Sequence, residues 1–230
     1  MTESLVGGAS AAPLSMRATA VVASAIVRAA RQLLTDLERG RRIDAAVLRS
    51  AMGSEDWHWL RYPYLHEGDT PDKRHAVRRF LQERGYRIAQ VTMSFDDYAY
   101  NDPYARCRAK DDKAAIDWLK ESYLQRAAES LSAAQAAARR LYGRDIAHVM
   151  LLHIGAFETV MLPRLLDLLD ERRFELVTLP EAERDPAYAV DPDVALEGGA
   201  TLLEQMAKAK GLTTPPRTDD ALARLGGQCR

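Results

Sequence analysis

Four short apolar segments, separated by stretches long enough for helices, constrain the fold of this chain more than any other feature. Apolar and aromatic side chains concentrate in residues 57–62, 86–95, 148–154 and 174–179. Segments of this length, bounded by proline, glycine or polar residues, are typical of buried strands. Because helical stretches connect them, we expect the strands to run parallel in one sheet. The sequence therefore predicts an α/β fold.

The connecting segments carry helical patterns with recognisable ends. Residues 72–84 have one apolar face and stop at Gly85, a residue type that commonly ends a helix. A longer helical stretch covers residues 103–141, with a break expected near Asp111 and a stop at Gly143. Further helices are predicted at 21–52, 156–172 and 200–210.

One domain accounts for most of the chain, because 230 residues of which 47% are hydrophobic can bury one substantial core. Residues 1–20 are rich in glycine, alanine and serine, so a disordered lead-in is predicted there. The domain is expected at residues 21–212, and residues 213–230 are expected to be a tail. A closed (β/α) barrel needs about eight strand–helix units. The four strands therefore predict an incomplete parallel barrel with surrounding helices.

Charge and cysteine content exclude several classes of protein. The net charge is -1, from 32 basic and 33 acidic residues, which argues against a nucleic-acid partner. There is no run of 18 apolar residues, so no membrane span is predicted. Cys107 and Cys229 lie far apart, have no metal-type spacing and define no disulfide framework. The compartment stays open on this evidence.

Polar side chains at the ends of three predicted strands are candidates for a functional site. Arg61 closes the first strand, Asp96 and Asp97 follow the second, and His153 ends the third. In parallel α/β folds the carboxyl ends of the strands form the ligand site. Histidine suits proton transfer near neutral pH, and arginine can orient a carboxylate. The structural alternatives are a histidine bonded to a backbone carbonyl, an aspartate in a turn or cap, and a surface ion pair.

Aromatic side chains near the first and second strands are candidates for stacking on sugar rings. They are Trp57, Trp59, Tyr62, Tyr64 and Tyr98. Alternation along a strand would direct about half of such side chains to the core instead. The remaining histidines do not have the i, i+4 spacing that would bring two imidazoles to one metal. They are His58, His66, His75 and His148.

Three segments resemble, in order, motifs of the NodB-homology polysaccharide deacetylases. The run Arg61-Tyr62-Pro63-Tyr64 is similar to the family's Arg-x-Pro-Tyr motif. The strand leading to Asp97-Tyr98 is similar to the one that ends in its Asp-Trp motif, with tyrosine in place of tryptophan. Leu151-Leu152-His153 is similar to its Leu-x-His motif, and residues 174–179 resemble its closing strand. The resemblance covers residues 33–210 of this sequence.

The resemblance implies a (β/α) barrel that hydrolyses the carbon–nitrogen bond of an N-acetyl group with help from a divalent, zinc-like metal. By position, His153 would be the general acid, Asp97 would tune it, and Arg61 would orient the catalytic aspartate. Leu151 would line the pocket for the acetyl methyl, and the backbone N–H of Tyr64 would help to hold the oxyanion. The implied substrate is an N-acetylated carbohydrate or a related small amide.

The chain departs from the family pattern ahead of Arg61, where it lacks the Asp-Asp pair and the His-x-x-x-His motif. Phe95-Asp96-Asp97 does not replace that pair, because it follows Arg61 and precedes no His-x-x-x-His. Metal ligands are therefore not identified. The resemblance then implies a truncated or degenerate hydrolase, or a fragment completed by another chain.

An alternative from a different class is a non-catalytic module that binds a glycan or a partner chain through the aromatic cleft around Trp59, Tyr62, Tyr64 and Tyr98. An incomplete barrel would also expose a parallel sheet edge, and such an edge favours self-association.

Overall fold

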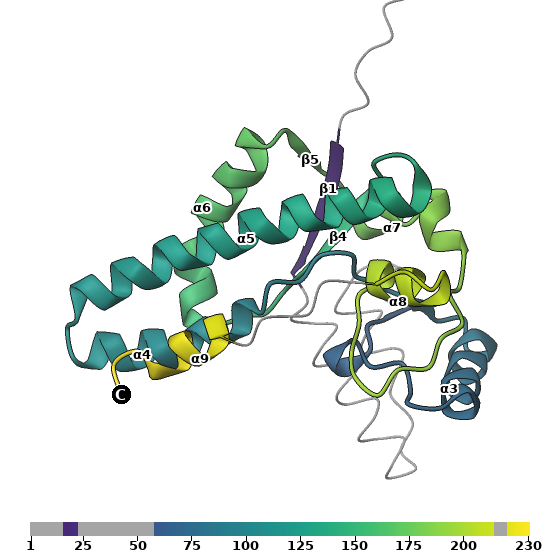
Figure 1. Cartoon of the computed structure of the whole chain (residues 1–230), viewed down its shortest axis with the longest axis horizontal. Coiled ribbons are helices and arrows are strands. Elements are labelled where there is room, and N and C mark those ends of the chain that lie inside the picture. The colour runs from purple at the N-terminus through teal and green to yellow at the C-terminus, as the bar shows by residue number, and fades with distance from the viewer. Residues whose placement is uncertain (1–15, 23–57, 214–219) are drawn as a thin grey trace, which may run out of the picture.

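The computed structural model describes residues 16–22, 58–213 and 220–230 (Figure 1). The helix predicted at 21–52 and Trp57 lie outside these ranges, except for two residues that belong to a strand. All strand pairings in the described part are parallel, as predicted. The strands form a small open sheet and a separate pair, and the described residues show no closed barrel. The α/β class is confirmed at this level.

Among the described residues, five strands make up the two sheets. In the larger sheet β1 (Met16–Val22) lies between β4 (His148–Leu152) and β5 (Phe174–Leu176). In the smaller, β2 (Trp59–Leu60) pairs with β3 (Arg87–Ile88). The predicted lead-in is wrong for residues 16–20, because they form most of β1. This segment contains β-branched residues, which favour strands, and it fills the place between two parallel neighbours.

The strand predicted at 86–95 is interrupted. Pairing with β2 stops after β3, and pairing resumes at Met93, which bridges Met150 of β4. The N–H of Leu151 donates to the carbonyl of Met93 at 2.9 Å. Between the two paired stretches the N–H of Gln90 donates to a carboxylate oxygen of Glu183 at 2.8 Å. A side chain therefore satisfies this backbone group, which pairs with no strand among the described residues.

The helices follow the predicted order. The longer ones are α3 (Pro71–Glu83), α4 (Asn101–Ala109), α5 (Lys113–Tyr142), α6 (Ala156–Glu171), α8 (Leu202–Ala209) and α9 (Asp220–Gly227). Short helical turns are η1 (Pro63–Leu65), η2 (Asp97–Tyr100), α7 (Leu179–Ala182) and η3 (Pro186–Ala189). Within the described ranges, no helix has both the length and the apolar character needed to cross a membrane.

The ends of α5 agree with the sequence signals. The carboxylate of Asp112 accepts a hydrogen bond from the N–H of Ala115 at 3.0 Å, so it caps the first turn. Asp111, at the predicted break, has a φ of 49°. Gly143 ends the helix with a φ of 70°, a conformation that costs glycine little.

One hydrophobic stripe makes α5 the main cover of the core. Its buried side chains recur every three or four residues, at Leu119, Tyr123, Ala127, Leu131, Ala134, Ala138 and Leu141. They pack with Met150 and Leu152 of β4, and the helix crosses the three-stranded sheet in Figure 1. On the other face of β4, Val149 packs with Trp59 and Leu179. Cover on both faces is typical of a parallel strand in an α/β protein.

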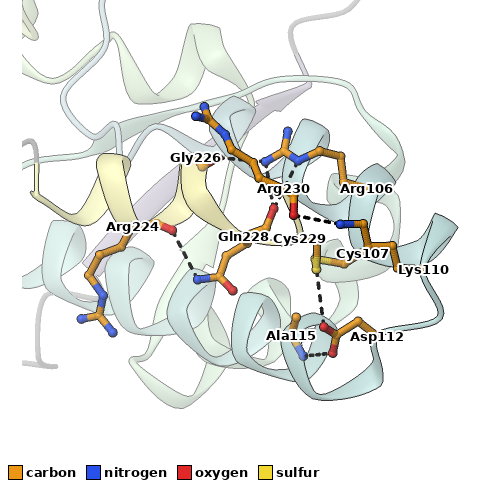
Figure 2. The surroundings of a disulfide bond; sticks show 10 residues. All are labelled: Arg106, Cys107, Lys110, Asp112, Ala115, Arg224, Gly226, Gln228, Cys229 and Arg230. Atoms are coloured by element: carbon orange, nitrogen blue, oxygen red, sulfur yellow. Dashed lines mark hydrogen bonds between the residues drawn. A yellow bond between two sulfur atoms is a disulfide. The ribbon is translucent and has the colours of Figure 1, made fainter.

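The C-terminal segment is tied to the rest of the chain (Figure 2). Cys229 forms a disulfide with Cys107 of α4, 122 residues away in the sequence. The guanidinium of Arg106 donates to the carbonyl oxygens of Gly226 and Gln228. Leu225 of α9 is buried in the main core. The predicted tail therefore contains a docked helix, and the two cysteines form a cross-link that their spacing did not define.

Candidate functional site

The structure brings Asp97 and His153 into direct contact. His153 is the residue after β4, and Asp97 begins η2, which follows the bridge at Met93. One carboxylate oxygen of Asp97 lies 2.9 Å from Nδ1 of His153, and the other accepts the backbone N–H of His153 at 2.6 Å. The carboxylate is 1% exposed, and the imidazole is 37% exposed. A buried acid therefore holds a histidine that reaches the surface.

The contact with Asp97 determines the protonation behaviour of His153. An ionised carboxylate only accepts hydrogen bonds, so Nδ1 carries the hydrogen and Nε2 is the nitrogen left for proton exchange. The hydrogen bond to Asp97 raises the pKa of His153, while partial burial and the positive charge of Arg61 oppose the rise. The imidazolium is thereby favoured more than in a free histidine, and a general acid must be protonated to act.

A salt bridge fixes the loop that carries Asp97. Asp96, directly before it, has a φ of 57°, in the left-handed region that is uncommon for a residue other than glycine. Its carboxylate pairs with Arg126 of α5 at 3.0 Å. Arg126 also donates to the carbonyl of Phe95. The long helix therefore holds the turn that aims Asp97 at His153.

The loop after His153 is fixed from a different helix. Gly155 precedes α6 and has no side chain to cap it. Asn101, at the start of α4, supplies the cap instead, because its Oδ1 accepts the N–H of Phe157 at 3.0 Å. A Cβ atom at Gly155 would lie 2.1 Å from that oxygen. Glycine is therefore required here for the close approach of Asn101.

The ring of Tyr98 packs against the exposed imidazole. The ring of Tyr98 meets that of His153 edge to face, with centroids 5.2 Å apart. The side chains of Tyr98 and Ile154 are 53% and 61% exposed. Asp97, Tyr98 and His153 are thus the predicted site residues that the structure brings into direct contact.

Arg61 is buried close to this group. Its Nε donates to the carbonyl of Ala89 at 3.4 Å. Within the described part of the chain its two terminal nitrogens are buried and have no hydrogen-bond partner. Burial lowers the pKa of Arg61 to about 10, and the negative charge of Glu183 opposes that shift. An unpaired buried guanidinium is a costly arrangement, so Arg61 is suited to accept an anionic partner.

The other predicted binding residues separate into buried and exposed. Trp59 is buried between β4 and α7, with the guanidinium of Arg87 over its ring. Tyr62 packs with Leu60 and Leu81 and lines a small cavity with Glu67 and Gln205. Both rings are thus part of the core, as alternation of side chains along a strand allows. Leu151 is buried within β4, two residues before His153.

Tyr64 is the most exposed of the predicted residues, at 90% of its side chain. It has a φ of 56° and lies in η1, where its carbonyl oxygen closely approaches Gly199. Its role in holding an oxyanion stays a prediction.

Ligands for the divalent metal that the resemblance implies are not identified among the described residues. Across residues 16–22, 58–213 and 220–230, no three side chains of histidine, cysteine, aspartate or glutamate gather as metal ligands would. Catalytic zinc is held by three protein ligands. No step of the chemistry is therefore assigned to a metal here.

Glu158 and Tyr123 form a buried pair that the sequence reasoning did not single out. The hydroxyl of Tyr123 donates to Oε2 of Glu158 at 2.6 Å, and Oε1 of Glu158 has no partner among the described residues. Burial and the negative charge of Asp97 raise the pKa of Glu158 to about 7. One sequence pattern could have predicted the burial of Glu158: it is an acidic residue on the apolar face of a helix, between Phe157 and Met161.

The described part of the chain is thus an α/β protein with a partly exposed histidine held by a buried aspartate. Comparisons with family models, with curated proteins and with solved structures found no match to this chain. The function is therefore inferred from the site itself and from the resemblance of its motifs.

Proposed function

We propose that this protein is a polysaccharide deacetylase-like hydrolase, which cleaves the carbon–nitrogen bond of N-acetyl groups on a carbohydrate. The observation that carries the proposal is the hydrogen bond between Nδ1 of His153 and the buried carboxylate of Asp97. His153 follows the carboxyl end of the parallel strand β4, and such strand ends are where α/β enzymes bind their substrates. The wider fold proposed with this function is an incomplete parallel barrel of the deacetylase type.

The proposed role of His153 is protonation of the departing amine. Hydrolysis adds water to the acetyl carbon, breaks the carbon–nitrogen bond and leaves a free amine and acetate. The amine nitrogen is a poor leaving group until it receives a proton, and Nε2 of His153 would supply it. Asp97 would hold the imidazole in the required tautomer and stabilise its positive charge. Arg61 would orient an anionic group, and Leu151 and Tyr64 would contact the acetyl group.

The test is release of acetate from an N-acetylated chito-oligosaccharide by the purified chain, with zinc or cobalt added. Replacing a general acid or its partner typically costs 10²–10⁴-fold in rate. We therefore expect His153→Ala and Asp97→Asn to lower acetate release by about 100-fold or more. His75→Ala is the matched control, because His75 is an exposed histidine of α3 that contacts Asp193 instead of Asp97. Equal rates in His153→Ala and the unchanged protein would refute the role of His153.

A second candidate is a non-catalytic module that binds a glycan or a partner chain. The exposed ring of Tyr98 favours it, since an aromatic face at the surface can stack on a sugar ring. Titration of the same oligosaccharide separates the two functions. Binding that Tyr98→Ala abolishes, in the absence of acetate release, supports the module and contradicts the hydrolase.

A further inference from the structure

A buried carboxyl group, that of Glu158, lies at the start of the helix that follows His153. Glu158 is in the first turn of α6, five residues after His153, and is 8% exposed. Most side chains of this kind are solvated, and burial of an acid without full hydrogen bonding costs free energy. Here Oε2 accepts one hydrogen bond, from Tyr123, and Oε1 accepts none from the described residues.

The surroundings hold Glu158 in place. Tyr123 is fully buried on α5, and its ring meets those of Phe95, Tyr100 and Phe157. Burial keeps the pKa of the Tyr123 hydroxyl far above its ordinary value, so this group remains a hydrogen-bond donor. A donor fixed in an aromatic cluster leaves the carboxyl little freedom to turn away from the site.

Residues on three neighbouring elements affect the ionisation of Glu158. Tyr123 faces it from α5, Asp97 acts from η2, and His153 acts from the end of β4. Asp97 favours the protonated acid and His153 the ionised one, and the N-terminal turn of α6 also favours negative charge. In return, ionised Glu158 favours the imidazolium of His153.

We propose that Glu158 is a positioning residue for His153: a buried carboxyl, oriented by Tyr123, whose negative charge makes His153 retain its proton. The inference deepens the proposed hydrolase, since a general acid is useful only while it is protonated. As the pH rises, Glu158 loses its proton and becomes negatively charged. This negative charge makes His153 bind its own proton more tightly. The site would thereby keep its acid form over a wider range of pH.

The test is the titration of the His153 imidazole, followed by nuclear magnetic resonance in the full chain. We expect Glu158→Gln to lower the pKa of His153 by about 0.5–1 unit, because it removes one nearby negative charge. Tyr123→Phe should also lower the pKa of His153, because Glu158 ionises less readily without the hydrogen bond from the Tyr123 hydroxyl. Glu171→Gln, an exposed position at the end of the same helix, is the matched control and should leave the titration unchanged.

An unchanged His153 titration in both Glu158→Gln and Tyr123→Phe would overturn the inference, and so would an equal shift in Glu171→Gln. If Glu158→Gln does not fold, Tyr123→Phe decides, because it removes one hydroxyl and keeps the ring in its cluster.

The outcome is separable from that of the proposed function. A shifted titration without acetate release supports the coupling and contradicts the hydrolase. Acetate release with an unchanged titration contradicts the coupling alone. Where both hold, the alkaline limb of the rate profile should move to lower pH in Glu158→Gln.

Discussion

At the scale of single residues, burial gives opposite protonation behaviour to two histidines at the two ends of one strand. His153 reaches the surface beside Asp97, which raises its pKa. His148, at the start of the same strand, is 1% exposed and bonded through Nδ1 to the hydroxyl of Thr92. Burial lowers the pKa of His148 to about 4. The first is suited to exchange protons, whereas the second is suited to stay neutral.

The buried His148 should weaken the protein in acid. The unfolded chain protonates this imidazole near pH 6.5, whereas the folded protein resists until about pH 4. The contribution of neutral His148 to the free energy of unfolding is therefore present above pH 6.5 and is lost as the pH falls towards 4. Between these values we expect the unchanged protein to lose about 3 kcal/mol more of its unfolding free energy than His148→Gln loses. Denaturant titrations at a series of pH values measure both, and parallel curves would contradict this account.

At the scale of elements, the site depends on helices that support loops distant in sequence. Arg126 of α5 holds the turn at Asp96, and Asn101 of α4 caps α6 beside His153. Gly155 permits that approach because it has no side chain. Neither support follows a local pattern, since each joins segments at least 30 residues apart. The geometry of the pair is therefore a product of how the helices pack.

Removing the cap should loosen the start of α6. Asn101→Ala leaves the N–H of Phe157 without its acceptor, and loss of a cap typically costs about 1 kcal/mol. We expect that loss in the free energy of unfolding, measured with denaturant. Asp102→Ala, at the next and exposed position, is the control and should cost less. Equal losses in the two variants would argue against the cap.

The disulfide should govern the docking of α9. Cys107 and Cys229 close a loop of more than 100 residues, for which the entropic model gives about 4–5 kcal/mol of stabilisation. Reduction, or Cys229→Ser, should lower the melting temperature and expose residues 220–230 to proteolysis. Calorimetry and mass spectrometry of the fragments report the two effects. If the reduced and oxidised proteins have the same melting temperature and the same susceptibility to proteolysis, α9 is held by its other contacts.

At the scale of the whole molecule, a buried ion-pair network joins α3 to a segment more than 100 residues later. The guanidinium of Arg74 is completely buried and bonds Asp191 and Asp193, the latter at 2.9 Å. It also lies 3.3 Å from Glu67, which in turn pairs with Arg78 at 2.7 Å. Removal of a buried charge leaves its partners uncompensated. This network attaches the smaller sheet and its helix to the C-terminal half of the chain.

Loss of Arg74 should destabilise the whole molecule. We expect Arg74→Ala to lower the free energy of unfolding by about 3 kcal/mol, at the low end for a buried pair because Asp191 and Asp193 remain partly exposed. Arg79→Ala changes the same residue type at an exposed position of α3 and should have little effect. Denaturant unfolding of the two variants measures the difference. A loss in Arg79→Ala as large as that in Arg74→Ala would rule out the network as its source.

The local elements were predictable because their signals are short-range. The stops at Gly85 and Gly143, the break near Asp111 and the order of strands and helices all follow from neighbouring residues. Strand lengths were less predictable, since pairing depends on partners elsewhere. The carboxylate of Glu183 binds the backbone at Gln90 and interrupts the predicted second strand.

The sequence by itself determined the α/β class and placed Asp97 and His153 at strand ends, because periodicity and end signals are properties of adjacent residues. Only the tertiary structure decided that these two side chains meet, that Trp59 and Tyr62 are buried, and that Glu158 is buried against Tyr123. It also decided that Cys107 meets Cys229 and that residues 16–20 enter the sheet. The physical reason is that burial and charge environment depend on residues far apart in the chain, which come together only when the helices pack on the sheet.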